Sequence, residues 1–229
     1  MLKGLILKDV YEIRFQLICG SFLMLLPYVI LAVMGEDIVA GDSQMPSELS
    51  EMMIVVMFGM LNFICIAVFS SMLLNTVGSD LACGWSKYQR TMPVSNERII
   101  GAKLSATALV VAGLVLISLA FNIIGIFSYG LNAEVMLSIP VICGLLQITA
   151  LSPVFPVSAK IGYKGANGIY IGFELIVIIG AVVVMFMAFS NDVSPVVLRL
   201  IFYGALPSVT LFSVFASYKA GKRAIAADL

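Results

Sequence analysis

Histidine is absent from this chain, and charged residues make up only 11% of its 229 residues. Without histidine the chain lacks the commonest metal ligand and the commonest general base. It contains no GxxxxGK[ST] motif, and therefore no P-loop for ATP. Its four cysteines form no CxxC pair, so we interpret them as small apolar residues and expect no zinc or disulfide framework. The remaining carboxylates do not cluster, and we expect neither a metal site nor catalysis in this chain.

Hydrophobic residues account for 61% of the sequence. A soluble domain has about 25% charged residues, more than twice the share found here. The net charge is zero, which gives no support for binding to nucleic acid. The composition therefore predicts an all-α, polytopic membrane protein that forms a single transmembrane domain over residues 1–229.

Six apolar runs are each close to the ~20 residues that a helix needs to cross a bilayer. They cover residues 15–34, 53–77, 104–126, 135–155, 168–189 and 195–218. Three prolines, Pro140, Pro153 and Pro156, should bend the fourth run. We expect residues 158–167 to form a short loop before the fifth.

Residues 1–14 alternate apolar and charged positions at helical spacing. One interpretation is a short amphipathic helix that lies on the membrane surface. The other is a simple cytoplasmic extension of the first span. The sequence leaves both open.

Basic residues are distributed unevenly between the segments that separate the six runs. All of them except Arg199 fall in residues 1–14, in the segment 78–103, between the fourth and fifth runs, or in the C-terminal tail. The segments on the opposite side carry acids instead. Because cytoplasmic segments are enriched in Lys and Arg, the sequence predicts a plasma-membrane protein with both termini and the segment 78–103 in the cytoplasm.

The segment 78–103, called the basic loop below, also contains the only tryptophan, Trp85, with Tyr88 three residues later. Aromatic and arginine side chains concentrate binding energy at protein interfaces, which suits a docking surface. The two aromatic residues equally suit an anchor at the lipid headgroups, and the spacing leaves both roles open. Ser95 followed by Glu97 is typical of a helix start near the end of the loop.

Polar residues interrupt the apolar runs, and one of them, Glu174, is acidic. A charged residue within a membrane is costly and is often functional, which makes Glu174 a candidate for the translocation path or for a contact with a partner helix. The alternative is a carboxylate near the interface, paired with Lys160, Lys164 or another base. The uncharged candidates for the path are Asn62, Asn75, Asn122 and Gln147. Each of these has an alternative role in a hydrogen bond between helices.

Most of the basic loop carries a recognisable pattern, Gly84-Trp85-x-Lys87-Tyr88-x-x-Thr91-Met92-Pro93-Val94-Ser95 followed by Arg98-Ile99-Ile100-x-Ala102-Lys103. This block resembles the cytoplasmic loop of ABC-2-type transporter permeases, in particular the small six-span subunits that accompany a separate ATPase. An LxxKD segment from Leu5 to Asp9, and Pro153 followed by Lys160-x-Gly162, add to the resemblance.

The resemblance implies that the segment around Asp80–Pro93 is a coupling helix between spans two and three that docks in a groove of the ATPase. The implied contact residues are Asp80, Trp85, Lys87, Tyr88, Arg90, Pro93 and Arg98. Residues 1–14 would be an interface helix. Two permeases, identical or not, would pair in the bilayer above two ATP-binding cassette subunits, and those subunits would hold the ATP and magnesium.

The function implied by the resemblance is ATP-driven export, with antimicrobial or amphipathic peptides as the substrate class. An ion-coupled secondary carrier is the first alternative, indicated by Glu174. A membrane protein that confers immunity by binding a peptide without transporting it is the second.

Overall fold

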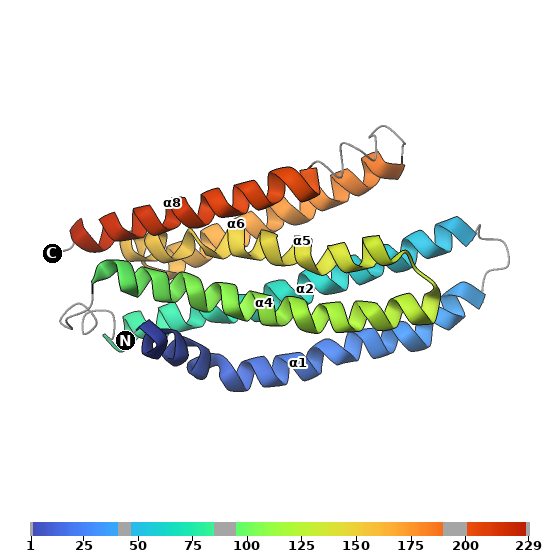
Figure 1. The fold of residues 1–229 in the computed structure, drawn as a ribbon, viewed down its shortest axis with the longest axis horizontal. Helices are drawn as coiled ribbons and strands as arrows, with labels where there is room; N and C mark the ends of the chain where they lie inside the picture. The colour runs from blue at the N-terminus through green and yellow to red at the C-terminus, as the bar shows by residue number, and fades with distance from the viewer. Residues whose placement is uncertain (1, 41–46, 85–94, 190–200, 228–229) are drawn as a thin grey trace. The chain divides into compact units, whose positions relative to one another are not determined.

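The computed structural model describes residues 2–40, 47–84, 95–189 and 201–227, and these ranges are entirely helical apart from turns (Figure 1). The helices, in chain order, are α1 (Leu2–Ala40), α2 (Ser47–Ala82), α4 (Asn96–Tyr129), α5 (Ala133–Leu151), α6 (Val154–Phe189), the π-helix η1 (Ile201–Ala205) and α8 (Leu206–Ala227). The all-α fold class predicted from composition is confirmed for this part of the chain.

Three stretches of the described residues are long and apolar enough to cross a membrane: Ile54–Asp80, Glu97–Ser128 and Ala133–Ser158. They contain most of the second, third and fourth predicted spans. The first and fifth predicted spans fall on α1 and α6. The sixth falls on η1 and α8 from residue 201, and its residues 195–200 lie outside the described residues. The total of six spans therefore remains a prediction.

Two boundaries differ from the expected arrangement. Helix α1 runs from Leu2 to Ala40, so residues 2–14 and the first predicted span lie on one helix. Residues 158–167, expected to be a loop, are helical except at Gly162, where φ is 77° and ψ is 171°. An L-residue with a side chain rarely adopts this φ, so glycine allows α6 to turn at a single residue.

The turn between α4 and α5 contains a C-terminal cap for α4 and an N-terminal cap for α5. Gly130, with φ 65°, donates its backbone N–H to the carbonyl of Ile126 at 2.9 Å. Asn132 then caps α5, because its Oδ1 accepts hydrogen bonds from the backbone N–H groups of Glu134 and Val135. Glycine after a helix and asparagine before the next one are the usual solutions for unpaired terminal groups.

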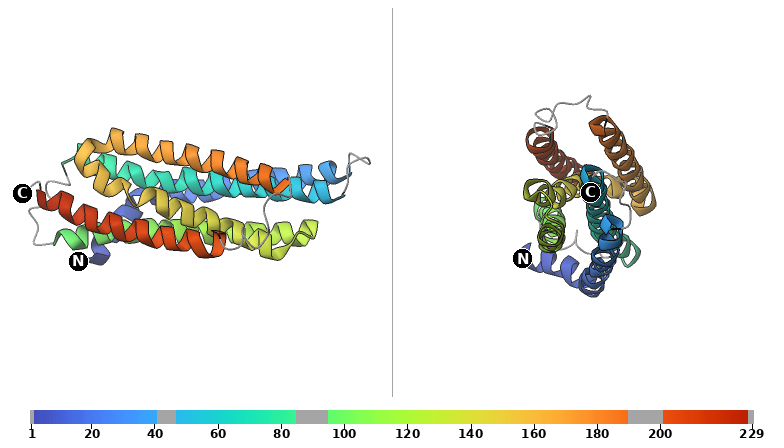
Figure 2. Two further views of the ribbon diagram at one scale, coloured as in Figure 1. Left: turned by 90° about the horizontal axis from the view of Figure 1, so that it is seen from above. Right: turned by 90° about the vertical axis from the view of Figure 1, so that its right-hand side faces the viewer.

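Contacts divide the chain into two compact units. Unit 1 contains Met1–Glu12, Leu73–Ala108 and Leu145–Leu229; unit 2 contains Ile13–Met72 and Leu109–Gly144. Helices α1, α2, α4 and α5 contribute residues to both. Within unit 1, the first turn of α1 and the last turn of α8 lie at the same end (Figures 1 and 2).

One buried apolar cluster of unit 2 consists of Ile54, Phe58, Leu131 and Met136. Helix α4 approaches this apolar cluster at Gly125, where an added Cβ would lie 2.7 Å from the ring of Phe58. The missing side chain thus allows α2 and α4 to pack closely, as small residues do between membrane helices.

In unit 1, α8 packs against α6, and hydroxyl groups connect α8 to α5. The hydroxyls of Thr149 and Thr210 are 2.9 Å apart, and those of Ser152 and Ser213 are 2.8 Å apart. Ser213 also donates to the backbone carbonyl of Thr149 at 3.2 Å. That carbonyl is the one left without a helical partner by Pro153, which has no N–H to donate.

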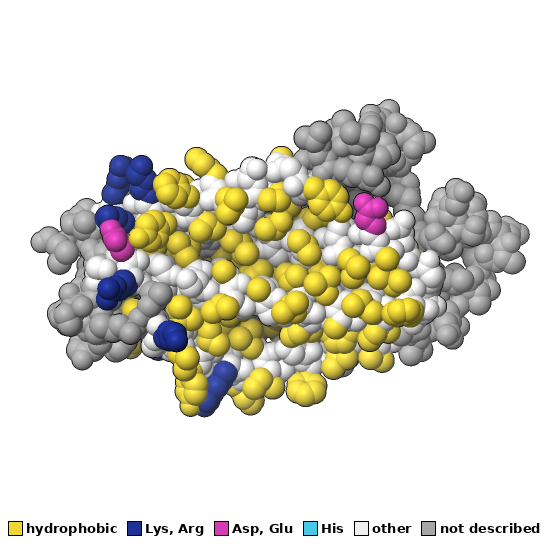
Figure 3. All heavy atoms as spheres, viewed as in Figure 1, with side chains coloured by type: hydrophobic (Ala, Val, Ile, Leu, Met, Phe, Trp, Pro, Cys, Tyr) yellow, Lys and Arg dark blue, Asp and Glu magenta, His cyan; other side chains and the backbone are white. Residues whose placement is uncertain are grey.

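Large apolar side chains are exposed on both units, including Leu211 and Phe212 in unit 1 and Phe15 and Phe127 in unit 2. In Figure 3, apolar side chains cover much of the visible face, and the visible Lys and Arg side chains gather near the chain ends. Soluble monomers rarely expose so much contiguous apolar surface, whereas helices in a bilayer do.

Candidate functional site: an ion cluster at the stems of the basic loop

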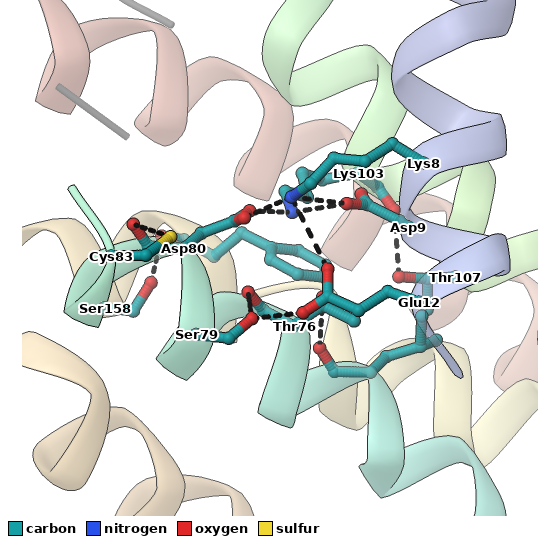
Figure 4. Close-up of polar contacts among 12 residues, drawn as sticks. Lys8, Asp9, Glu12, Thr76, Ser79, Asp80, Cys83, Lys103, Thr107 and Ser158 are labelled. Atoms are coloured by element: carbon teal, nitrogen blue, oxygen red, sulfur yellow. Dashed lines mark hydrogen bonds and ion pairs between the residues drawn. The ribbon is translucent and has the colours of Figure 1, made fainter. Parts of the chain in front are cut away.

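Six polar side chains from three helices of unit 1 meet where α2 ends and α4 begins (Figure 4). We call them the ion cluster: Lys8, Asp9 and Glu12 from α1, Ser79 and Asp80 from α2, and Lys103 from α4. Asp80 lies on the stem by which the chain enters the basic loop, and Lys103 lies on the stem by which it leaves. The cluster therefore joins both stems of the loop to α1.

Lys103 is at the centre of the cluster. Its Nζ lies 2.9 Å from Asp9 Oδ1 and 2.6 Å from Asp80 Oδ2, so one ammonium group bridges α1 and α2 from α4. The side chains of Asp9 and Asp80 are only 3% and 7% exposed. Two buried carboxylates would repel each other at high cost, and the shared lysine is what makes their proximity tolerable.

Lys8 closes the outer side of the cluster. It forms an ion pair with Asp80 Oδ1, and its Nζ lies 3.5 Å from Glu12 Oε2, one helical turn along α1. Glu12 in turn accepts a hydrogen bond from the hydroxyl of Ser79 on α2. The first three turns of α1 are thus attached to α2 at two successive points.

Burial and the neighbouring charges together shift the pKa values of two members of the cluster. Burial raises the pKa of Asp9, and the attraction of Lys103 and Lys8 offsets this only in part. Burial acts to lower the pKa of Lys8, but the hydrogen bond and the charge of Asp80, with those of Asp9 and Glu12, outweigh it and leave that pKa raised. Lys8 therefore stays charged, while Asp9 holds a proton more readily than a free aspartate.

Most of the loop residues implicated by the resemblance, Trp85, Lys87, Tyr88, Arg90 and Pro93, lie outside the described residues. The two that are described differ in exposure: Asp80 is buried in the ion cluster, whereas Arg98 is exposed in the first turn of α4.

The predicted helix start at Ser95 is confirmed. Helix α4 begins at Asn96, and the carbonyl of Ser95 accepts the backbone N–H of Arg98 at 2.9 Å. Glu97, in the first turn, forms an exposed ion pair with Lys222 of α8. The exit stem of the loop is therefore connected to α8 as well as to α1.

Two of the candidate path residues, Asn62 and Asn122, lie together in unit 2. Both are fully buried, and Asn62 Nδ2 donates to Asn122 Oδ1 at 3.0 Å. Asn122 Nδ2 donates to the carbonyl of Met136 at 2.7 Å. Pro140, four residues after Met136, cannot supply the helical N–H for that carbonyl, so Asn122 replaces a hydrogen bond that the proline removes. These contacts are the interhelical bonds that the sequence offered as the alternative to a path.

Glu174 and Gln147 lie together in unit 1. Gln147 is fully buried on α5 and donates from Nε2 to Glu174 Oε1 on α6 at 2.8 Å; its own Oε1 accepts the hydroxyl of Tyr170 at 3.1 Å. Among the described side chains, an amide is thus a partner of Glu174. The side chain of Lys160, one of the bases offered as an alternative partner, lies outside the described residues. Asn75, the remaining candidate, is exposed, and its Oδ1 accepts the hydroxyl of Tyr163 at 3.2 Å.

None of the four cysteines forms a disulfide bond. Within the described residues, no group of three or more His, Cys, Asp or Glu side chains is arranged to hold a metal ion. In the ion cluster, Asp9 and Asp80 both form ion pairs with the ammonium group of Lys103. Their carboxylates therefore have cationic partners from the chain itself.

The apolar helices and the exposed apolar surface define a helical membrane protein. The sequence model of the ABC-2 family transporter proteins matches residues 4–221, nearly the whole chain. The chain belongs to this family and is the membrane component of a transporter. Such permeases are typically non-catalytic, carry no cofactor and pair with ATP-binding subunits. A search of curated proteins finds no match to the chain.

Proposed function

We propose that this chain is the permease subunit of an ATP-driven exporter whose ATPase is a separate subunit that docks on the basic loop. Family membership supports a transport role. The lack of a P-loop in the sequence means that ATP has to be hydrolysed elsewhere. The loop carries the aromatic and basic side chains that suit a protein interface.

The observation that carries the proposal is the ion cluster. Asp80 on one stem of the loop and Lys103 on the other are bonded to each other and to residues 8 and 9 of α1. A displacement of the loop by a docked ATPase would pull on both stems together. Ion pairs that are largely buried resist separation, so the movement would pass to the start of α1.

The proposed topology has six spans, with both termini on the cytoplasmic side of the plasma membrane. The distribution of lysine and arginine supports it. So does unit 1, in which the start of α1 and the end of α8 lie at the same end (Figure 2). A second permease, identical or paralogous, would complete the pore, and the resemblance supports amphipathic or antimicrobial peptides as the substrate.

Among the candidate path residues, we propose Glu174, Gln147 and Asn75 as contacts along the route. Asn62 and Asn122 are fully buried within one chain and bonded to each other. A path role for these two would require that pair to open during transport.

The test is co-expression of the chain with a P-loop ATPase encoded by a neighbouring reading frame, followed by co-purification and transport into inverted vesicles. Trp85→Ala and Arg90→Glu should leave ATP hydrolysis in place while transport falls about tenfold or more, because an interface hot spot is worth about 2 kcal/mol. Arg223→Glu, a matched charge reversal at an exposed residue of α8, should transport normally.

Two results would overturn the proposal. One is the absence of any ATPase partner together with full transport in the two loop variants. The other is uptake without ATP that Glu174→Gln abolishes, which would make the chain an ion-coupled carrier. Peptide binding without transport in either direction would indicate an immunity protein.

A further inference from the structure

Four hydroxyl groups connect α5 and α8 within unit 1, and we call them the hydroxyl seam: Thr149 and Ser152 on α5, Thr210 and Ser213 on α8. Each α5 hydroxyl has one partner on its own helix and one on α8. Thr149 Oγ1 lies 2.8 Å from the carbonyl oxygen of Leu145 and 2.9 Å from Thr210 Oγ1. Ser152 Oγ lies 3.4 Å from the carbonyl oxygen of Thr149 and 2.8 Å from Ser213 Oγ. Since a hydroxyl has a single hydrogen and can rotate, each can turn from one helix to the other.

Two carbonyl groups of α5 also have a hydroxyl of α8 within range. Thr210 Oγ1 lies 3.3 Å from the carbonyl oxygen of Leu145, and Ser213 Oγ lies 3.2 Å from that of Thr149. If α8 moved away, the α5 hydroxyls would keep both carbonyls hydrogen-bonded. The Thr149 carbonyl needs such a donor, because Pro153 supplies no helical N–H. These α5 groups therefore do not depend on α8 for their hydrogen bonds.

Helix α8 carries a third hydroxyl at the spacing of the seam. Ser213 follows Thr210 by three residues and Ser217 follows Ser213 by four, which places all three on one side of the helix. Ser217 is 4% exposed. The two helices run in the same direction, because the later hydroxyl of one lies opposite the later hydroxyl of the other. A shift of α8 by one turn, about 5 Å, would bring Ser213 opposite Thr149. Ser217 would then lie opposite Ser152, so both pairs of the seam would form again.

Beyond the seam, α8 is attached to the exit stem of the basic loop. An added Cβ at Gly221 would lie 2.8 Å from Ile100 Cδ1 of α4, so the two helices approach closely there. Lys222 forms an ion pair with Glu97 in the first turn of α4. Gly221 follows Ser213 by eight residues, about 12 Å along the helix. A displacement of this stem along the axis of α8 would therefore reach the seam.

We propose that α8 occupies two registers along α5. One is the register of this structure, and in the other, shifted by a turn, Ser213 and Ser217 take the places of Thr210 and Ser213. A one-turn shift between packed helices is an established form of conformational switch. The interhelical hydrogen bonds define the two positions, and the bonds of the α5 hydroxyls to their own helix lower the cost of passing between them. That an ATPase on the basic loop drives the shift rests on the proposed function. The two registers do not, because every residue involved belongs to this chain.

The experiment measures the position of α8 along α6, which packs against it in unit 1 and is joined to α5 by the bond between Gln147 and Glu174. Spin labels are attached at Ile179→Cys on α6 and Lys219→Cys on α8, both of which are exposed. The full chain, with its four native cysteines changed to alanine, is placed in nanodiscs without an ATPase. Double electron–electron resonance should show two distance populations that differ by up to about 5 Å, the length of one turn.

Two variants of α8 test whether the hydroxyls define these populations. Ser217→Val should lower the shifted population about fivefold, because it removes a hydrogen bond of that register. Ser208→Val is the matched control: it removes an exposed hydroxyl of α8 that bonds to the carbonyl of Gly204 and takes no part in the seam. It should leave both populations unchanged.

A cross-linking measurement covers the case in which Ser217→Val fails to fold. Ser152→Cys with Ser217→Cys exchanges hydroxyls for thiols of similar shape, and mild oxidation should join them, because the shifted register brings these two side chains together. Thr149→Cys with Thr210→Cys, whose hydroxyls are neighbours in this structure, is the positive control. A single distance population in the parent chain, an unchanged shifted population in Ser217→Val, or a disulfide in the control pair alone would each overturn the two registers.

Addition of an ATPase partner with ATP to the labelled chain tests what drives the shift. ATP should change the ratio of the two populations. An unchanged ratio overturns only the drive by the ATPase. If no ATPase partner exists, the exporter is overturned, while two populations in the isolated chain uphold the registers.

Discussion

The ion cluster of unit 1 and the asparagine pair of unit 2 both connect helices, but they do so with different kinds of side chain. Each joins helices through buried polar groups. The cluster uses formal charges, with Lys103 between Asp9 and Asp80, near helix ends that flank the basic loop. The pair uses neutral amides, Asn62 of α2 and Asn122 of α4.

The difference follows from what each arrangement can tolerate. Lys8 at the edge of the cluster is 30% exposed, so water contributes to its solvation there. Asn62 and Asn122 have no exposure, and an ion at either position would cost several kcal/mol. Charged contacts therefore occur beside the basic loop, where part of the cluster is open to water, and neutral ones occur where the side chains are fully buried.

Breaking the ion cluster should have the largest effect. Asp80→Leu leaves Lys103 with one carboxylate in place of two and Lys8 without its closest one, and removal of one partner of a buried pair costs about 3–5 kcal/mol. Denaturant titration in detergent micelles measures the free energy of unfolding.

The double variant Asp80→Leu with Lys103→Met removes one charge of each sign and should recover a good part of that loss. If the single and double variants were equally unstable, apolar packing and not charge pairing would hold the three helices together. Lys164→Met, a lysine that is exposed on α6, is the matched control and should unfold like the wild type.

Removal of the amide of Asn122 should have a smaller effect. Asn122→Leu leaves the carbonyl of Met136 without a partner, because Pro140 supplies no N–H. The expected loss is about 1–3 kcal/mol, the cost of an unsatisfied buried group.

Pro140→Ala sharpens this prediction through a double-mutant cycle. Alanine restores the helical N–H to Met136, so Asn122→Leu should cost less in the Pro140→Ala background than in the wild type. Additive losses would mean that Asn122 acts through Asn62 alone and not through the proline.

The smallest expected effect is the pH dependence of the ion cluster. The pKa of Asp9 is raised above 3.8, so the folded chain takes up this proton at a higher pH than the unfolded chain does. As the pH falls through the folded pKa towards 3.8, Asp9 therefore contributes an increasing amount to the stability of the folded state. The difference in unfolding free energy between the wild type and Asp9→Asn should shift in favour of the wild type over that interval, and a flat difference would contradict the prediction.

The helices were predictable from the sequence because long apolar runs specify them locally. The runs 53–77 and 104–126 fall within α2 and α4, and the start of α4 follows from Ser95 and Glu97. The single-residue turn at Gly162 was not predictable, since lysines and glycines over residues 158–167 have the composition of a loop. The backbone turns at one glycine, and the neighbouring residues remain helical.

Pairings between helices could be predicted only in part. The LxxKD segment marked Lys8 and Asp9 through the resemblance, but no local pattern assigns them to Asp80 and Lys103, which lie more than 70 residues away. Pro140 in α5 allows one further prediction. Because it has no N–H, the carbonyl of Met136 needs another donor, and a buried amide such as Asn122 can supply it. Which amide would supply the bond depends on packing that the sequence does not encode locally.

Gly162 has a consequence for anyone who engineers this chain. Only Gly162 is non-helical between the two parts of α6, so the connection cannot absorb an added residue. Both parts are packed, because Ser158 before the glycine and Ala166 after it are buried. One extra residue inserted there would rotate the following segment by about 100°, because a helix has 3.6 residues per turn. Tyr170 and Glu174 would then face a different side of α6, so epitope tags and reporter fusions belong elsewhere in the sequence.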